Sequence, residues 1–358
     1  MSDLVRPRIL NILVDGRPGT RTRALQIGNL EFEVVDVILG SGSAWLLLLK
    51  ALFIPRRFGQ FDAVMTSEYF SSFAINFRLL ATLCPTPHIT VGLNQSRQLL
   101  KSGHAAIDGA INRIFGRGDL YIMHSRKELD LFNRIHHLNL EKLMFSHWGF
   151  DHPGVGSDTF RTWPRPYVCL VGRNNRDVDL FCQVCRQLDC DGVIVCSSHQ
   201  KMPQELPGNV HVFRDLDMER AMSCIKHALA NLILVKDGER GAGHITAVAA
   251  MLLETPQIAS TVEVLSDYLI DGYNCLAVPI GDADAIRDAI AAILSAPDMS
   301  AELASNGREY AGRWLSHQAA TERVFAAVHK ILCGESVQAV DPEWLRYFSS
   351  VSKPRPNL

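Results

Sequence analysis

VKDGERGAGHITAVAAMLLETPQIASTVEVLSDYLIDGYNCLAVPIGD, residues 235–282, is the stretch that decides the fold. It begins with a polar, glycine-spaced loop at 237–244 and continues into an apolar pattern over 245–253 that predicts a helix. Two short apolar runs, at 256–259 and 275–278, then predict strands. A loop that opens a helix in a parallel α/β sheet presents N–H groups at the positive end of the helix dipole. The stretch therefore predicts an anion-binding site.

The same stretch resembles the donor-binding domain of retaining glycosyltransferases with the GT-B fold, the large group often called family 4. In that family an acidic residue and a Gly-rich loop open a helix. A Gly-x-Pro turn follows, and then a D-x-x-x-D-G-x-N-G segment that ends in Val-Pro. The matching positions here are Glu239, Gly241, Gly243 and His244 in the loop, 255–260 in the turn and 267–279 in the last segment.

Two positions depart from the pattern of this family. Ala249 stands where a second Glu usually binds the ribose hydroxyls, and Thr255 stands where glycine is usual. The ribose then lacks its usual carboxylate, unless Glu254 or a backbone carbonyl takes its place. A non-catalytic relative with weakened donor binding is therefore the main alternative to an active enzyme.

The chain of 358 residues is long enough for two domains, each with its own core. Apolar residues make up 47% and charged residues 21%, a balance typical of globular chains. The net charge of −2 is uneven, because residues 1–150 hold 17 Lys and Arg against 12 Asp and Glu, and the rest hold 19 against 26. The basic half favours an anionic partner or surface, although a chance imbalance of solvated faces explains the counts equally well.

The nine cysteines are scattered and lie mostly inside apolar runs, which predicts buried thiols in a reducing cytoplasm. Cys182 and Cys185 have no second pair at metal-binding spacing, so a zinc or redox site is not expected. The polar start, MSDLVRPR, shows no signal-peptide pattern. We expect a cytoplasmic protein, and no feature of the chain predicts a nucleic-acid partner.

Short apolar runs alternate with helical periodicity in both halves of the chain, which predicts parallel sheets. The expected fold class is α/β, with two doubly wound, Rossmann-like domains facing a cleft, as the GT-B resemblance implies. The expected domains are an acceptor-side domain at 1–150, a donor-binding domain at 151–332, and a tail at 333–358 that could cross back to the first domain.

The first apolar run, 9–14, leads into a loop with two glycines. In GT-B proteins a glycine loop at this point approaches the donor phosphates, and Gly16 and Gly19 could do so here. A tight turn without a ligand is an equally good interpretation. Because ligands of doubly wound sheets collect at the carboxyl ends of strands, Glu68 and Asn94 are acceptor-side candidates.

Residues 43–58, SAWLLLLKALFIPRRF, form an unusually apolar segment. It is too short to span a bilayer, which needs about 20 residues. An interfacial helix and a core helix of the sheet domain are both possible. The resemblance favours membrane contact, because many bacterial members of the family glycosylate lipid-linked acceptors. We expect peripheral binding to the anionic inner face of the cytoplasmic membrane. The contact candidates are Trp45, Leu48, Phe53, Arg56 and Arg57.

The second domain opens with an apolar run at 167–171, followed by Gly172-Arg173-Asn174-Asn175-Arg176. The family carries Gly-Arg here, with a second basic residue soon after, and both usually face the donor diphosphate. The leaving diphosphate gains negative charge, which arginine can neutralise through bidentate hydrogen bonds. Arg173 is the strongest candidate, whereas Arg176 could instead lie at a solvated helix start.

The resemblance assigns roles to the remaining candidates. Glu239 would lie close to the donor sugar, whereas the 243–246 loop, with the His244 side chain, would face the β-phosphate. Glu239, His244 and Arg173 would form the catalytic set. A solvated loop Glu and a structural His are the competing interpretations. The donor-binding candidates are Gly16, Gly19, Arg176, Ser198, Val212, Gly243, Ile245 and Thr246.

The resemblance implies a metal-independent, retaining glycosyltransferase. It would move a sugar from a UDP- or GDP-linked donor to a glycan or lipid-linked acceptor, as in polysaccharide biosynthesis, without a cofactor. Three D-x-D strings, at 189–191, 215–217 and 282–284, read as loops or helix caps, and we expect them to bind neither Mg²⁺ nor Mn²⁺. The alternatives are a non-catalytic GT-B-like scaffold subunit and a nucleotide-sugar epimerase, the latter without supporting residues.

Overall fold

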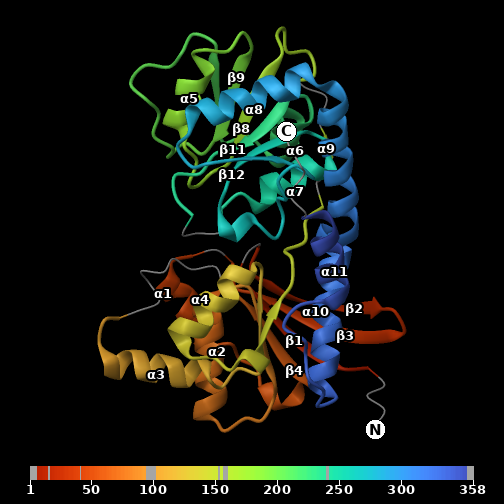
Figure 1. Ribbon diagram of the computed structural model, residues 1–358. Coiled ribbons are helices and arrows are strands. Elements are labelled where there is room, and N and C mark those ends of the chain that lie inside the picture. Colours follow the sequence, from red (N-terminus) through yellow and green to blue (C-terminus); the bar gives the residue numbers. More distant parts are fainter. Residues whose placement is uncertain are drawn as a thin grey trace. The chain divides into compact units, whose positions relative to one another are not determined.

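The computed structural model describes residues 6–14, 17–40, 42–93, 102–151, 154–155, 160–238 and 242–352. The chain divides into two compact units. The first comprises Met1–Ser146 and Ala320–Asp341, and the second comprises His147–Ala319 and Pro342–Leu358. Each unit is built around a sheet of its own (Figure 1).

The first unit holds a seven-stranded sheet in the order β2-β3-β1-β4-β5-β6-β7, in which β2 alone is antiparallel to its neighbour. Most of its parallel strands are short apolar runs with little exposed surface, as expected when helices cover both faces of a sheet. The strands are β1 (Arg8–Leu13), β2 (Gly19–Ile27), β3 (Leu30–Ile38), β4 (Ala63–Ser67), β5 (His88–Val91), β6 (Leu120–Met123) and β7 (Leu143–Phe145).

Strand β2 begins at Gly19, the second glycine predicted to approach the donor phosphates. It pairs with β3 through a two-residue turn that Gly28 opens at φ 55°. Its side chains are exposed or half-buried because β2 forms the edge of the sheet. Gly19 pairs with Ile38 in this ladder, so it is a strand residue and not part of a phosphate-binding loop. Gly16 lies outside the described residues.

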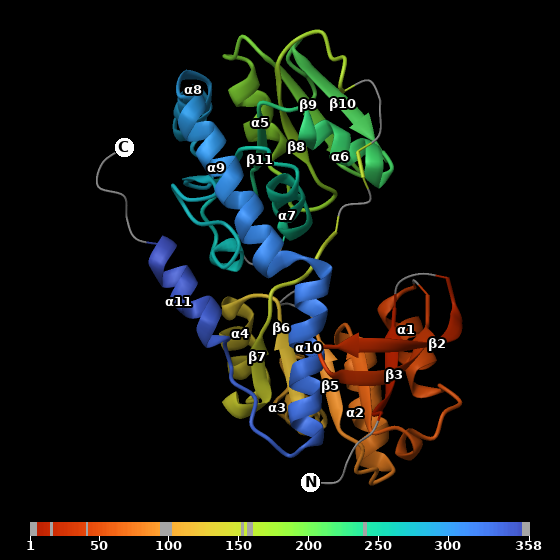
Figure 2. The same ribbon diagram turned by 90° about the vertical axis from the view of Figure 1, so that its right-hand side faces the viewer.

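Helices pack on both faces of the first sheet. On one face, apolar side chains of α1 and α2 meet those of β1, β3 and β4. On the other face lies α10 (Figure 2). There the rings of Phe325 and Phe32 meet edge to face with centroids 5.1 Å apart. The helices are α1 (Ala44–Leu52), α2 (Tyr69–Ala81), α3 (Ala105–Phe115), α4 (Arg126–His136) and α10 (His317–Leu332).

The second unit holds a fully parallel six-stranded sheet in the order β10-β9-β8-β11-β12-β13. Apolar side chains of α5 and α8 pack on one face, and those of α6 and α7 pack on the other. This doubly wound arrangement confirms the predicted fold class. The strands are β8 (Tyr167–Val171), β9 (Asp191–Cys196), β10 (Val210–Arg214), β11 (Ala230–Ile233), β12 (Gln257–Ser260) and β13 (Leu276–Val278).

The end of the chain is divided between the two units. The helices of the second unit are α5 (Val178–Cys185), α6 (Met218–Lys226), α7 (His244–Leu252), α8 (Ala283–Ser295), α9 (Pro297–Tyr310) and α11 (Pro342–Val351). The segment that returns to the first unit is Ala320–Asp341, which holds most of α10, whereas α11 belongs to the second unit. Trp344 holds α11 there, because its ring is buried and its Nε1 donates to the Tyr310 hydroxyl at 2.9 Å.

Candidate functional site

The strand order of the second sheet locates the candidate site. The order changes direction between β8 and β11, and ligands of doubly wound sheets bind beyond the carboxyl ends of the strands at such a point. Residues 172–177 follow β8, and residues 234–243 lead from β11 to α7. Both loops carry motifs that the sequence singled out, and the fold brings them to the same edge of the sheet.

Hydrogen bonds join these two loops. The backbone N–H of Asp177 donates to the carbonyl oxygen of Leu234 at 2.9 Å. The side-chain amide of Asn175 donates to the carbonyl oxygen of Asp237 at 3.0 Å. Asn175 has φ 52°, a left-handed conformation that asparagine adopts more readily than most residues. The loop after β8 is therefore held against the loop that opens α7.

Helix α7 begins without a side-chain cap. Its N-cap residue is Gly243, at φ 111°, and a Cβ there would lie 2.9 Å from the Ile233 side chain. The Thr246 hydroxyl donates to the carbonyl oxygen of Gly243 at 3.0 Å. The first N–H groups of an α-helix have no partner within the helix, and they stand at the positive end of its dipole. This helix start has the properties of a phosphate-binding site.

Arg176 is buried, with only 4% of its surface exposed, and does not lie at a solvated helix start. Its guanidinium donates from Nε to the carbonyl oxygen of Val171 at 3.1 Å and from Nη1 to that of Asn174 at 3.2 Å. Nη2 donates to Thr246 Oγ1 at 3.1 Å. Burial lowers the pKa of Arg176 to about 10, so the side chain remains cationic at neutral pH. A positive charge is thus enclosed beside the start of α7.

Arg173 is exposed on the same loop. Its charge acts on Asp215, which follows β10. The hydrogen bond from the Ser198 backbone N–H is the main cause that holds the pKa of Asp215 below its usual value, and Arg173 contributes to the same shift. Arg173 and Ser198 are both exposed at the carboxyl edge of the sheet, so both are open to a ligand.

The His244 imidazole is held by two neighbours. Nε2 donates to the carbonyl oxygen of Val264 at 3.0 Å, since a carbonyl oxygen can only accept. The ring also meets Tyr268 edge to face, with centroids 4.6 Å apart. Tyr268 lies in the acidic D-x-x-x-D-G segment, and only the fold shows that its ring reaches His244. Ile245, beside it, is 43% exposed.

Two residues considered for the ribose are not suited to that role. Ala249 is fully buried in an apolar cluster beneath β8 and β9, so a carboxylate at this point would enter the core. Glu254 follows the carboxyl end of α7 and pairs with Arg308 at 3.2 Å. A helix rises about 1.5 Å per residue, so Glu254 is more than a turn away from the phosphate-binding end of α7. No substitute for the missing carboxylate comes from these positions.

The remaining donor candidates are dispersed. Val212 lies within the edge strand β10, opposite Ile194 of β9, and does not reach the edge where Arg173 lies. Glu239 lies outside the described residues, so its catalytic role stays a prediction. The fold brings Arg176 to Thr246 at the start of α7, next to Gly243, His244 and Ile245, whereas the charge of Arg173 acts on Asp215 after β10.

In the first unit, Glu68 follows β4 and caps α2. Its Oε2 accepts hydrogen bonds from the backbone N–H groups of Phe70 and Ser71 at 3.1 and 3.2 Å. The backbone of Glu68 has φ 83°, a conformation that non-glycine residues rarely adopt. His124, which the sequence did not single out, follows β6, and a Cβ on Gly92 would meet its Nε2 at 2.9 Å. Asn94 lies outside the described residues.

The predicted membrane-contact segment forms α1. Trp45 and Phe53 are 76% and 77% exposed, Arg57 is exposed, and Leu48 and Arg56 are half-buried. Ser43 caps the helix by accepting from the N–H of Leu46. Across the described residues, no helix combines the length and the apolar character needed to cross a membrane.

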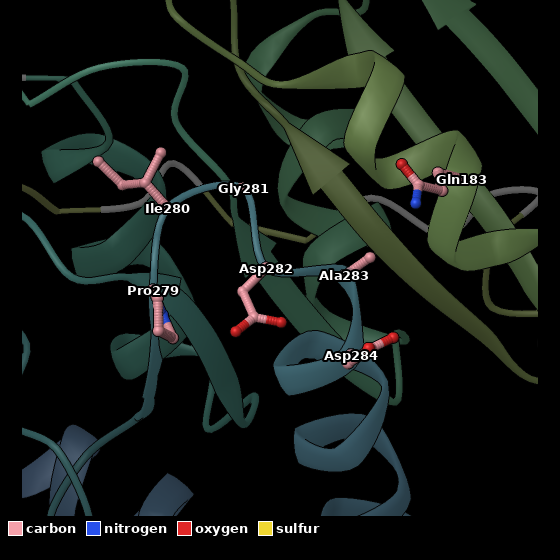
Figure 3. Close-up of a pocket in the computed structure, with 7 residues that line it drawn as sticks. All are labelled: Gln183, Pro279, Ile280, Gly281, Asp282, Ala283 and Asp284. Carbon is pink, nitrogen blue, oxygen red and sulfur yellow. The ribbon is translucent and has the colours of Figure 1, made fainter.

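An open pocket of about 490 Å³ lies where β13 leads into α8 (Figure 3). Two carboxylates, Asp282 and Asp284, line it, and its other lining side chains carry no positive charge. Asp282 caps α8 by accepting from the N–H of Ala285 at 2.9 Å, as a helix cap does. The pocket is therefore unsuited to a diphosphate, and it is separate from the residues at the start of α7.

Comparisons with known proteins agree with this arrangement. Residues 199–310 match the family described as Glycosyl transferases group 1. Among curated proteins, no sequence matches the chain.

Solved structures share the fold along nearly the whole chain. Sucrose-phosphate synthase from Thermosynechococcus elongatus is 16% identical, with a TM-score of 0.65 over 92% of this chain and 89% of that protein. The Anabaena protein HepE in complex with UDP is 11% identical, with a TM-score of 0.66 over 90% of this chain and 100% of that one. An α,α-trehalose-phosphate synthase (UDP-forming) from Burkholderia vietnamiensis is 10% identical, with a TM-score of 0.61 over 91% of this chain and 100% of that one. These solved structures show that the chain has the GT-B fold, and residues 199–310 are similar to the group 1 glycosyl transferases.

Proposed function

We propose that the protein transfers a sugar from a nucleotide-sugar donor to an acceptor hydroxyl, with retention at the anomeric carbon and without a metal ion. The observation that carries this proposal is the enclosed cation Arg176, which contacts the first turn of α7 and follows the same strand as the exposed Arg173. A nucleoside diphosphate leaving group gains negative charge in the transition state. Fixed positive groups at this point would stabilise it, as a metal ion does in other enzymes.

A UDP-linked sugar is the first donor to test. HepE was solved in complex with UDP and with UDP-glucose, and the Burkholderia protein is described as UDP-forming. Within this chain, the helix start would bind the diphosphate through backbone N–H groups, and Arg173 would bind it through its exposed guanidinium. The oriented His244 would lie beside the donor sugar. A GDP-linked donor remains the second candidate.

Calorimetric titration with UDP and GDP in the presence of EDTA tests the donor site. We expect one nucleotide to bind and the Arg173→Ala variant to lose about tenfold in affinity or more, as for a charged hydrogen bond. A transfer assay with the matching nucleotide-sugar would then give the anomeric configuration of the product by NMR. An inverted product would refute retention, and activity lost with EDTA and restored by Mg²⁺ would refute metal independence.

A non-catalytic scaffold subunit is the second candidate, and the burial of Ala249 favours it. Residues 246–251 of α7 carry no carboxylate for a ribose, because all six side chains are apolar or threonine and are buried. Failure of the folded protein to bind UDP or GDP, together with the absence of donor hydrolysis, would select the scaffold over the enzyme.

We propose further that the acceptor is a lipid-linked or polysaccharide precursor and that α1 binds the cytoplasmic membrane face. The support is the exposure of Trp45 and Phe53 beside Arg57. Trp45→Glu with Phe53→Glu should abolish co-sedimentation with vesicles that contain anionic lipid. Leu83→Glu is the matched control, because Leu83 is 87% exposed outside α1. Equal sedimentation of both variants would exclude α1 as the contact.

A further inference from the structure

Each of the three guanidinium nitrogens of Arg176 donates a hydrogen bond, although the side chain is almost completely buried. Its three nitrogens donate to Val171 at the end of β8, to Asn174 in the following loop, and to Thr246 in the first turn of α7. The Thr246 hydroxyl in turn donates to the carbonyl oxygen of Gly243. One guanidinium thus connects the strand, the loop that carries Arg173, and the helix start.

Gly172 leaves the space that this guanidinium occupies. A Cβ on Gly172 would lie 2.5 Å from Arg176 Nε and 2.6 Å from its Nη2. A Cβ on Gly243 would lie 2.9 Å from Ile233, so this glycine lets the helix start pack against β11. Gly172 is therefore needed for the loop to close around the guanidinium. The guanidinium is almost inaccessible to a ligand phosphate, because Arg176 is only 4% exposed.

From this geometry we propose that Arg176 is a positioning residue: it fixes the Arg173 loop against the first turn of α7, and the phosphates of the donor contact Arg173 and the helix start instead. The inference rests on the proposed donor site. It reassigns Arg176, which the spacing of the two arginines had placed with the phosphate ligands. The partners of Arg176 in the described part of the chain are neutral oxygens, so they do not neutralise its charge. This charge therefore makes the electrostatic potential at the helix start more positive, although the guanidinium does not contact the donor phosphates.

Substitution of Arg176 by lysine distinguishes a phosphate ligand from a positioning residue. A phosphate ligand needs mainly a cation, so Arg176→Lys would preserve much of the binding. A positioning residue needs three donors in a planar arrangement, which an ammonium group on a flexible chain does not provide. We therefore expect Arg176→Lys to weaken UDP binding about tenfold, nearly as much as Arg176→Met, which matches the loss of one or two hydrogen bonds. Arg173→Lys, which keeps a charge on an exposed ligand, should lose less than Arg173→Met.

Thr246 supplies the matched test. Thr246→Val removes the acceptor of Arg176 Nη2 and keeps the side-chain shape, whereas Thr246→Ser keeps the hydroxyl and should recover most of the affinity. If Arg176 acts through Thr246, the double variant Arg176→Lys/Thr246→Val should be no weaker than the weaker single variant. The proposal would be overturned if the affinity loss of the double variant equalled the product of the two single losses. It would also be overturned if Arg176→Lys bound UDP within about twofold of the wild type.

Hydrogen exchange of the ligand-free protein separates this proposal from the donor site itself. The amides of α7 should exchange faster in Arg176→Lys and Thr246→Val, and Thr246→Ser should exchange more slowly than Thr246→Val. Exchange in α8 reports whether each variant is folded. If Arg176→Lys does not fold, the comparison of Thr246→Val with Thr246→Ser tests the role of Arg176. If the wild-type protein binds neither UDP nor GDP, the proposed donor site is wrong. The exchange rates of α7 would then still test the role of Arg176. Unchanged exchange in α7 would refute that role.

Discussion

The His244 imidazole meets the ring of Tyr268 edge to face, with the ring centroids 4.6 Å apart. The hydroxyl of Tyr268 accepts a hydrogen bond from the backbone N–H of Trp148 at 2.8 Å. Because Nε2 of His244 is already bound to the Val264 carbonyl, these contacts leave the imidazole one orientation at the start of α7. Tyr268 therefore positions His244 from a segment that follows α7 in the chain.

Replacement of Tyr268 should affect catalysis through this contact. Tyr268→Leu removes the ring and should lower kcat about tenfold with a small change in the KM of the donor, because a displaced group costs more in the transition state than in binding. Tyr268→Phe keeps the ring and should lose much less, although the unpaired N–H of Trp148 should cost about 1 kcal/mol of stability. Equal kcat losses in the two variants would show that the hydroxyl, not the ring, matters.

The glycine after β8 should tolerate no side chain. Gly172→Ala would place its Cβ 2.5 Å from the guanidinium of Arg176, so the loop or the arginine must move. We expect a loss of about 1–3 kcal/mol of stability, typical of overpacking, together with weaker UDP binding. Thermal unfolding and calorimetry measure the two effects. Gly19→Ala is the control for stability, because a Cβ at Gly19 meets no atom within 4 Å.

His88 should make the first unit less stable in acid. It is fully buried, with Nε2 2.9 Å from the Thr66 hydroxyl oxygen and Nδ1 2.7 Å from Asn76 Oδ1. Burial, with a smaller contribution from Arg117, lowers the pKa of His88 from 6.5 to about 3. Below pH 6.5 the unfolded chain therefore binds the proton that the folded protein rejects, so stability falls as the pH falls from 6.5 toward 3.

This contribution should amount to about 2 kcal/mol between about pH 7.5 and about pH 5. Urea unfolding at both pH values, followed by hydrogen exchange in β4 and β5, measures it. His88→Gln should be less stable at the higher pH but should lose less on acidification than the wild type. His104→Gln, at an exposed position, should keep the wild-type loss. The same loss in His88→Gln would exclude His88 as its source.

Two tryptophans should differ sharply in their contribution to stability. Trp344 is 1% exposed and donates to the Tyr310 hydroxyl, whereas Trp45 is 76% exposed. Trp344→Ala should cost about 3–5 kcal/mol, since it removes a large buried ring. Trp45→Ala should change stability by no more than about 0.5 kcal/mol, as at a typical surface position. Hydrogen exchange in α9 for the first variant and in α2 for the second measures these losses.

Much of the fold can be predicted from short apolar runs in the sequence. The runs at β5 and β8 are short, apolar and bounded by polar turns, because parallel strands covered on both faces need such side chains. Strand β2 lacks this pattern, since it forms the sheet edge, where its Thr side chains are exposed and Arg21 and Arg23 pair with the buried Asp36. The Gly28-Asn29 pair is its recognisable signal, because such pairs open two-residue hairpins.

The sequence predicted the candidate donor site less well than the fold. Arg173 and Arg176 stand three residues apart after the same strand, and their spacing does not show which one is buried. The answer depends on Gly172, which leaves room for the guanidinium, and on Thr246, which is seventy positions away from Arg176 in the chain. The role of Ala249 likewise depends on which side of α7 faces the apolar cluster under β8. These are tertiary relationships that local spacing does not contain.

The assignment of Ala320–Asp341 to the first unit has a consequence for synthesis on the ribosome. Val324, Phe325 and Val328 cover a face of the first sheet that includes Ile9, Phe32 and Met65. Among the described residues, this cover from α10 becomes available only after residue 320 has been translated, whereas the strands of the second sheet are present by Val278. The amino-terminal unit therefore completes its core last, and until then the nascent chain offers an apolar surface that chaperones would recognise.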